Sequence, residues 1–197
     1  FEAAKIFERW DPARKIAVQY WPQGEGGDLR MQNPYWIAYR NPRNTDKKRY
    51  MANVSIAFDI LPWLNVSGRA KIDNTNSIFT QKLYASSNTT ITEGSTQGHY
   101  TEIRNTDEQI YADVMVNINK TFADNKFSLV ANVGASVNDT KSKELSYRGP
   151  IREVGIPNMF TVFDLDKEKS RAQKYGWQEQ TQSIFASVEM GYKSMLY

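Results

Sequence analysis

Apolar and polar residues alternate along five segments of the chain. In the clearest of them, which runs from Lys126 to Asn138, every second residue is apolar: Phe127, Leu129, Ala131, Val133, Ala135 and Val137. The residues between them are polar or small, apart from Val130. Successive side chains of a β-strand point to opposite faces of its sheet. The pattern therefore predicts a strand with one apolar face and one polar face.

Four further segments repeat this pattern. Their apolar rows are Ala52, Val54, Ile56 and Phe58; Leu64, Val66, Gly68, Ala70 and Ile72; Ile110, Ala112, Val114, Val116 and Ile118; and Ile184, Ala186, Val188, Met190 and Tyr192. Each segment spans about 9 to 13 residues, the length that a tilted strand needs to cross a bilayer. Strands of ordinary globular proteins are shorter, with roughly 5 or 6 residues. The length favours transmembrane strands.

The connections between these segments alternate in length. Residues 59–62, 121–125 and 193–194 form short turns, whereas residues 74–99 and 140–180 are long and polar. If the strands run up and down, every short turn falls at one end of the sheet and every long loop at the other, as in outer-membrane barrels. Aromatic residues, which favour the bilayer interface, stand close to the short turns: Phe58, Trp63, Phe122, Phe127, Tyr192 and Tyr197.

Composition supports this interpretation and excludes several classes of function. Only 40% of the 197 residues are apolar, while 13% are aromatic, which suits an outward-facing apolar surface around a wet interior. The formal charge of +3 is small and its cations are dispersed, so nucleic acid is not an expected partner. The chain contains no Cys, which excludes disulfides and thiolate metal sites.

The first 49 residues show no regular period. They are rich in Pro and Gly, which favour irregular backbone, and they fall on the long-loop side of the strand pattern. We therefore expect residues 1–49 to be an extracellular loop region and residues 50–197 to supply about five to six transmembrane strands. So few strands cannot close a barrel and would leave two unpaired edges. All 197 residues are thus expected to be one arc of an all-β, antiparallel, up-and-down transmembrane barrel.

Several short sequences resemble the barrel of SusC/RagA-type TonB-dependent receptors of Bacteroidetes. They are the NPYW sequence at 33–36, the RYMANVS sequence at 49–55, the LPWL turn at 61–64 before a strand that carries Arg69 and Asp73, and the closing hairpin at 183–197. The motifs cover residues 30–75 and 180–197, and their order and spacing carry the resemblance. The strands between them match by pattern alone.

This resemblance implies a role in import across the outer membrane. Members of the family are integral multi-pass barrels with an N-terminal plug, and no plug-like segment is present here. They work with a SusD-like lipoprotein that covers the lumen, and they take energy from the TonB complex, here through an N-terminal part that this chain lacks. Their substrates are oligosaccharides or peptides. A barrel of about 22 strands, the size given for outer-membrane transporters, is expected.

Two sets of residues are candidates for ligand or partner binding. The first is the polar strand face, above all Arg69, Lys71 and Asp113, which could hydrogen-bond a polar solute or the plug; the alternative is a hydrated wall with no specific ligand. The remaining members of that face are Asn53, Ser55, Asn65, Ser67, Asn117, Asn132 and Ser136. The second set is aromatic and could stack on sugar rings or contact a lipoprotein; the alternative is packing within the loops. It consists of Trp10, Trp21, Tyr35 and Trp36.

The sequence offers little for catalysis. His99 is the single histidine, so a metal site with two histidines is impossible, and we expect this residue in a loop without a catalytic role. No enzyme activity, cofactor or metal is therefore predicted. The main alternative to a transporter is a soluble β-sandwich, such as a carbohydrate-binding module, whose apolar strand faces would pack against a second sheet. Small residues on the apolar face, such as Ala112 and Ala135, argue against that core because they would leave voids.

Overall fold

The computed structural model describes residues 5–20, 32–124 and 126–193. The first elements are small. Strands β1 (Glu8–Asp11) and β2 (Ile16–Gln19) form an antiparallel pair, and helix α1 (Pro34–Arg40) follows. The side chain of Asn33 caps this helix by accepting a hydrogen bond of 2.9 Å from the backbone N–H of Tyr35. Pro34 fits the first turn because the first N–H groups of a helix have no partner within it.

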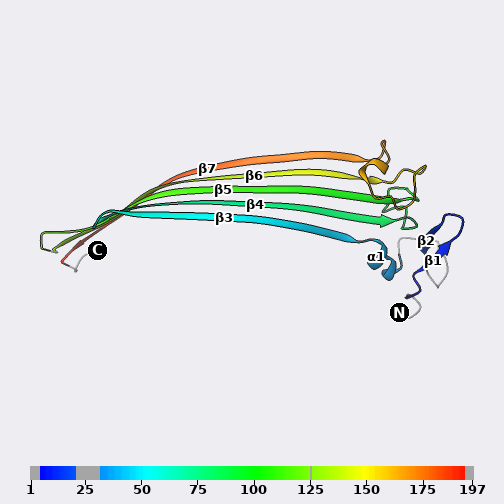
Figure 1. Ribbon diagram of the computed structural model, residues 1–197, viewed down its shortest axis with the longest axis horizontal. Coiled ribbons are helices and arrows are strands. Elements are labelled where there is room, and N and C mark those ends of the chain that lie inside the picture. The colour runs from blue at the N-terminus through cyan, green and yellow to red at the C-terminus, as the bar shows by residue number, and fades with distance from the viewer. Residues whose placement is uncertain (1–4, 21–31, 125, 194–197) are drawn as a thin grey trace. The chain divides into compact units, whose positions relative to one another are not determined.

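The main element is a five-stranded antiparallel sheet in which neighbours in sequence are neighbours in space (Figure 1). Its strands are β3 (Arg43–Leu61), β4 (Leu64–Tyr84), β5 (Gly98–Phe122), β6 (Phe127–Pro150) and β7 (Arg171–Tyr192). The all-β architecture and the up-and-down strand order agree with the sequence prediction. All five strands contain an apolar row identified from the alternation.

The strands are much longer than the alternating segments, with 19 to 25 residues each. Much of the two segments expected to be long loops is therefore strand: β4 continues to Tyr84, and β6 continues to Pro150. The actual connections are residues 85–97 and 151–170. The prediction of strand ends was wrong because both faces become polar there. Backbone pairing continues in such a stretch, but the apolar period that reveals a strand disappears.

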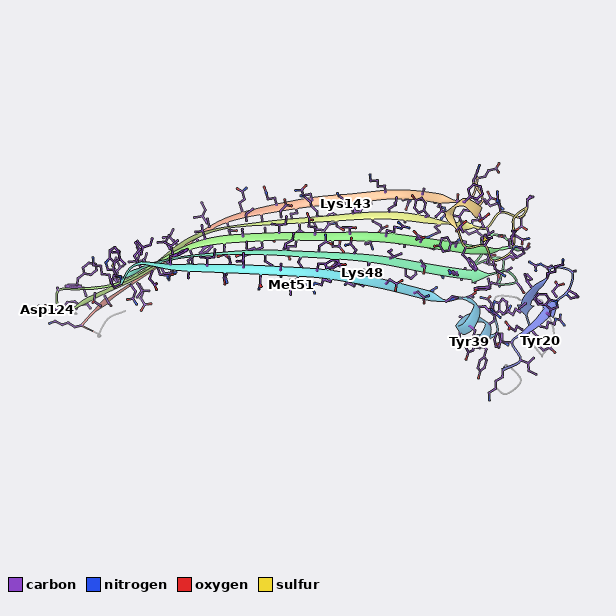
Figure 2. All side chains as sticks on the ribbon, in the orientation of Figure 1. Tyr20, Tyr39, Lys48, Met51, Asp124 and Lys143 are labelled. Carbon is purple, nitrogen blue, oxygen red and sulfur yellow. The ribbon has the colours of Figure 1, made fainter. Side chains whose placement is uncertain are left out.

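The short turns lie at one end of the strands and the long connections at the other, as predicted. Residues 62–63 join β3 to β4, and residues 123–126 join β5 to β6. In the second turn Ala123 and Asp124 have φ of 53° and 52°, the left-handed backbone that matches the twist of a hairpin. The N–H of Lys126 donates to the carbonyl of Ala123 at 3.1 Å. Figure 2 shows Asp124 at this end of the strands.

The chain divides into two compact units. The loop unit comprises Phe1–Lys47, Ser77–Asn105 and Glu144–Tyr175, and the strand unit comprises Lys48–Asn76, Thr106–Lys143 and Gly176–Tyr197. Nearly all buried apolar residues found in the described ranges belong to the loop unit: Trp36, Leu83, Ala85, Tyr100, Ile151 and Leu165. In the strand unit only Ala131 is buried among them.

The loop unit has a small core that fixes its two connections to the strand ends. Ile151, which is 1% exposed, donates its N–H to the carbonyl of Gly98 at 2.9 Å and pairs with Leu165 in an isolated bridge. Gly98 has a φ of +116°, and a Cβ there would lie 2.6 Å from the carbonyl oxygen of Leu83. Only glycine fits this close approach.

The strand unit is a single layer whose apolar face is open. Val114 and Val133 lie on inner strands of the sheet, yet they are 49% and 48% exposed. At the edges Val54 and Val188 are exposed as well. No helix or second sheet covers these rows within the part of the chain that the structure describes. Among those residues, no helix is long and apolar enough to span a membrane.

Candidate functional site

Hydrogen bonds and ion pairs join neighbouring strands across the polar face of the strand unit. Each of them connects side chains from two different strands: Arg49 with Asp73, Arg69 with Asp113, Asn65 with Asn117, Asn76 with Thr106, Gln109 with Asn138, Asp107 with Ser142, and Asn132 with Ser187. Cross-strand pairs of this kind stabilise a sheet. They also leave few polar groups free, so the face is an organised wall. Lys48, Met51 and Lys143 mark the extent of this unit along the sheet in Figure 2.

Arg69 and Asp113 form the most buried ion pair of this wall. The Nε of Arg69 on β4 lies 2.9 Å and 3.2 Å from the two carboxylate oxygens of Asp113 on β5. The Asp113 side chain is only 2% exposed, whereas that of Arg69 is 61% exposed. The carboxylate therefore depends on the arginine for its compensation, while the arginine keeps most of its surface free for other contacts.

Lys71 and Arg49 share a second carboxylate. Asp73 accepts two hydrogen bonds from the Arg49 guanidinium, one of them 2.8 Å long, and lies 3.8 Å from the Lys71 ammonium. Residues 69, 71 and 73 alternate with the apolar row of β4, so they occupy one face. Lys71 at 41% side-chain exposure has donors left for a ligand. Arg49 was not among the predicted site residues, although its opposite charge to Asp73 is visible in the sequence.

A hollow of about 390 Å³ lies between these cations. Its polar lining is Asn53, Ser55, Arg69, Lys71 and Tyr111. These groups donate and accept hydrogen bonds and carry two positive charges. None of them forms a nucleophile–base pair, so the arrangement suits reversible binding of hydroxyl, carbonyl or anionic groups. The structure thus brings Arg69 and Lys71 together, while Asp113 serves as the partner of Arg69.

One aromatic side chain departs from the polar pattern. Phe185 stands in the polar row of β7, between Ser183 and Ser187, and its ring lies over Gly134 of β6. A Cβ at Gly134 would be 2.4 Å from two ring carbons. Sequence reasoning missed this pair. The signal that could have revealed it is a glycine facing an aromatic residue on the neighbouring strand, because glycine leaves room for a ring across a sheet.

The four predicted aromatic site residues have different surroundings. Trp10 on β1 is 64% exposed and so remains open to a ligand. Tyr35 is half-buried and stacks with Phe7, with ring centroids 6.4 Å apart. Trp36 is fully buried, and its Nε1–H donates to the Ser87 hydroxyl at 3.0 Å. This is the internal packing weighed as the alternative. Trp21 lies outside the described residues.

Solved structures of the RagAB peptide transporter share the fold of this chain. One superposes with a TM-score of 0.69 at 15% identity, covering 90% of this chain and 19% of that chain. The RagAB peptide importer in its open-open state gives 0.65 at 15% identity over 89% of this chain and 18% of that chain, and in its closed-closed state 0.64 at 15% identity over 82% and 17%. The chain therefore spans less than a fifth of the length of these solved chains.

No family model matches the chain, and no curated protein matches it by sequence. The likeness at 15% identity shows a shared fold. The solved chains that have this fold are transporters by their description and not enzymes.

Proposed function

We propose that this chain is part of the wall of an outer-membrane β-barrel importer of the SusC/RagA, TonB-dependent type. In this proposal the apolar face of the strand unit contacts lipid and its polar face lines a water-filled lumen. The observation that carries the proposal is the open apolar face: rows such as Val54 to Phe58 and Ile184 to Met190 are exposed. Soluble monomers rarely expose continuous apolar surface of this extent, whereas lipid covers it at no cost.

The sheet edges support the same proposal. β3 and β7 each have a neighbour on one side only among the described strands, and each has about twenty residues. Unpaired backbone groups are costly in a bilayer, and long open edges promote aggregation in water. Further strands would therefore continue the sheet on both sides. We propose a closed barrel of about 22 strands, the size typical of outer-membrane transporters.

Import of a polar solute fits the chemistry of the inner wall. We propose oligosaccharides or peptides as substrates, a SusD-like surface lipoprotein as partner, and energy supply from the TonB complex through a part of the protein outside this chain. Arg69 and Lys71 are exposed cations between amide and hydroxyl groups, which bind hydroxyl and carbonyl oxygens. The solved structures that share this fold are described as a peptide transporter and a peptide importer, which favours peptides between the two classes.

A soluble β-sandwich fits less well. Its apolar faces would pack about 10 Å from a second sheet, but the second sheet found in the described ranges has only the two four-residue strands β1 and β2. Ala112 and Ala135 on the apolar face would also leave gaps in a protein core. They leave none against fluid acyl chains.

Uptake by cells tests the proposal. A strain that lacks the whole protein is compared with the same strain carrying it, using labelled peptide and oligosaccharide mixtures, with and without a proton uncoupler. We expect energy-dependent accumulation of one solute class only when the protein is present in the outer-membrane fraction. Equal accumulation of both classes in the two strains, or a protein recovered in the soluble fraction, would contradict the proposal.

A further inference from the structure

The loop unit contains a pocket separate from the polar strand face. It has a volume of about 820 Å³, which is in the range of small-ligand sites. Residues from α1, β3, β4, β5, β6 and the connection 85–97 line it, so chain segments far apart in sequence meet there. Exposed Ile37 and Ile91 give it apolar surface, and Arg43 and Arg148 give it positive charge.

The two arginines of the pocket have no carboxylate partner among the described residues. The guanidinium of Arg43 donates from two nitrogens, each at 3.1 Å, to the amide oxygen of Gln81, which is neutral. Arg148 takes part in none of the ion pairs formed by the described residues. Both residues are exposed. Two guanidinium groups facing one pocket without a counter-charge favour an anionic ligand, because each presents a planar set of donors that fits a carboxylate.

The one carboxylate that lines this pocket in the described ranges is already engaged. Glu93 has its oxygens 3.6 Å from the Arg171 guanidinium and 3.7 Å from Nε2 of His99. Glu93 and Gly94 both have left-handed backbone, with φ of 54° and 88°. Glu93 is therefore held toward Arg171 and His99, and it does not neutralise Arg43 or Arg148.

His99 supplies an independent sign of a binding site. Sequence reasoning placed it in a loop, but it lies on β5 with a side chain only 6% exposed. Its Nδ1 is buried and has no hydrogen-bond partner among the described residues. Polar atoms left unpaired in this way are uncommon and costly, and they mark functional sites more often than ordinary core positions. Burial lowers the pKa of His99, and the charges of Arg148 and Arg171 lower it further despite Glu93, so the ring is neutral near pH 7.

From these contacts we propose that the loop-unit pocket binds a carboxylate group, held by the guanidinium groups of Arg43 and Arg148, with the attached chain lying against Ile37 and Ile91. A peptide with a free C-terminus and an acidic sugar such as a uronate both carry this group. The proposal does not rest on import, because the pocket is complete within the loop unit.

Calorimetric titration of the whole protein in detergent tests the proposal with two pairs of probes. The first pair is a short apolar peptide with a free C-terminal carboxylate and the same peptide amidated; the second is a uronate trisaccharide and its neutral hexose counterpart. We expect the acid of at least one pair to bind about tenfold or more tightly than its neutral form, since a charge-assisted bidentate pair is lost in the latter. The pair that shows the difference identifies the source of the carboxylate.

Variants then assign the binding to the pocket. Arg148→Gln should remove most of the acid preference, and Arg148→Lys should retain part of it because the charge stays while the paired donors are lost. The matched control is Arg104→Gln, an exposed arginine of the same unit that pairs with Glu102 and does not line the pocket. Equal binding of acid and neutral probes by the unmodified protein would overturn the proposal. So would an acid preference that falls equally in Arg148→Gln and Arg104→Gln.

Discussion

Arginine at the centre of the apolar face provides the sharpest energetic test of lipid contact. Val133 lies near the middle of the row from Phe127 to Val137. This row is about 33 Å long at roughly 3.3 Å per residue, and a strand tilt of about 40° gives it a height of about 25 Å, the height of the apolar band of such barrels. An arginine at Val133 would therefore begin about 12 Å from either interface.

Val133→Arg should destabilise the barrel by roughly 2–4 kcal/mol, and Val137→Arg, at the end of the row, by only about 0–1 kcal/mol. The matched control is Asn132→Arg. Asn132 adjoins Val133 but faces the opposite side, where it donates to the Ser187 hydroxyl at 3.1 Å. Loss of that neutral hydrogen bond should cost about 1 kcal/mol, because the new guanidinium remains in water.

Equilibrium unfolding of the whole protein in phospholipid vesicles, followed by tryptophan fluorescence during a guanidinium titration, measures these differences. A sheet with water on both faces would tolerate Val133→Arg within about 0.5 kcal/mol. A sandwich core would be destabilised by Val133→Arg and Val137→Arg alike, with or without lipid. Either result would refute the lipid-facing assignment.

Three further predictions concern single contacts. Gly134→Val should cost roughly 1–3 kcal/mol through overlap with the Phe185 ring, and Phe185→Ala should relieve part of this cost in a double-mutant cycle; purely additive unfolding energies would show that the ring does not lie there. Arg69→Gln should cost about 1–3 kcal/mol, because the buried carboxylate of Asp113 loses its partner, and an unfolding titration in which Asp113→Asn restores none of the loss would argue against this pair. The lowered pKa of His99 means that the unfolded loop unit binds a proton more readily than the folded one, so its stability should be complete above about pH 6.5 and decline as the pH falls below that value. Limited proteolysis at pH 7.5 and 5.5 should show this acid sensitivity in the unmodified protein and much less of it in His99→Gln; equal sensitivity would exclude His99 as its cause.

The alternation of apolar and polar residues was sufficient to predict the sheet, its strand order and which residues share a face. Val133 and Asn132 illustrate why: one face meets an apolar environment and the other does not, so the sequence must alternate. The same reasoning could not find the far ends of the strands. Near Tyr84 and Pro150 the pattern contains no consistent apolar row, although the backbone ladder continues.

The candidate site was predicted in part. Arg69 and Lys71 were found because cations in a strand row point to one face, and the structure places them around a common hollow. Trp36 was expected as a possible ligand contact, but the sequence cannot show that its indole reaches Ser87, 51 residues away. The pocket around Arg148 and His99 was missed for the same reason. Its residues come from six segments, and only the folded loop unit brings them together.

Quenching of single fluorophores tests lipid contact most directly. Because these 197 residues contain no Cys, single cysteines can be placed and labelled at Val54 and Val188 on the apolar face and at Asn53 and Ser187 on the polar face. In vesicles containing lipids with brominated acyl chains, we expect strong quenching at Val54 and Val188 and little effect of aqueous iodide there, with the reverse at Asn53 and Ser187. Iodide quenching at all four positions, or no bromine quenching at any of them, would contradict the proposal that lipid covers the apolar face of this sheet.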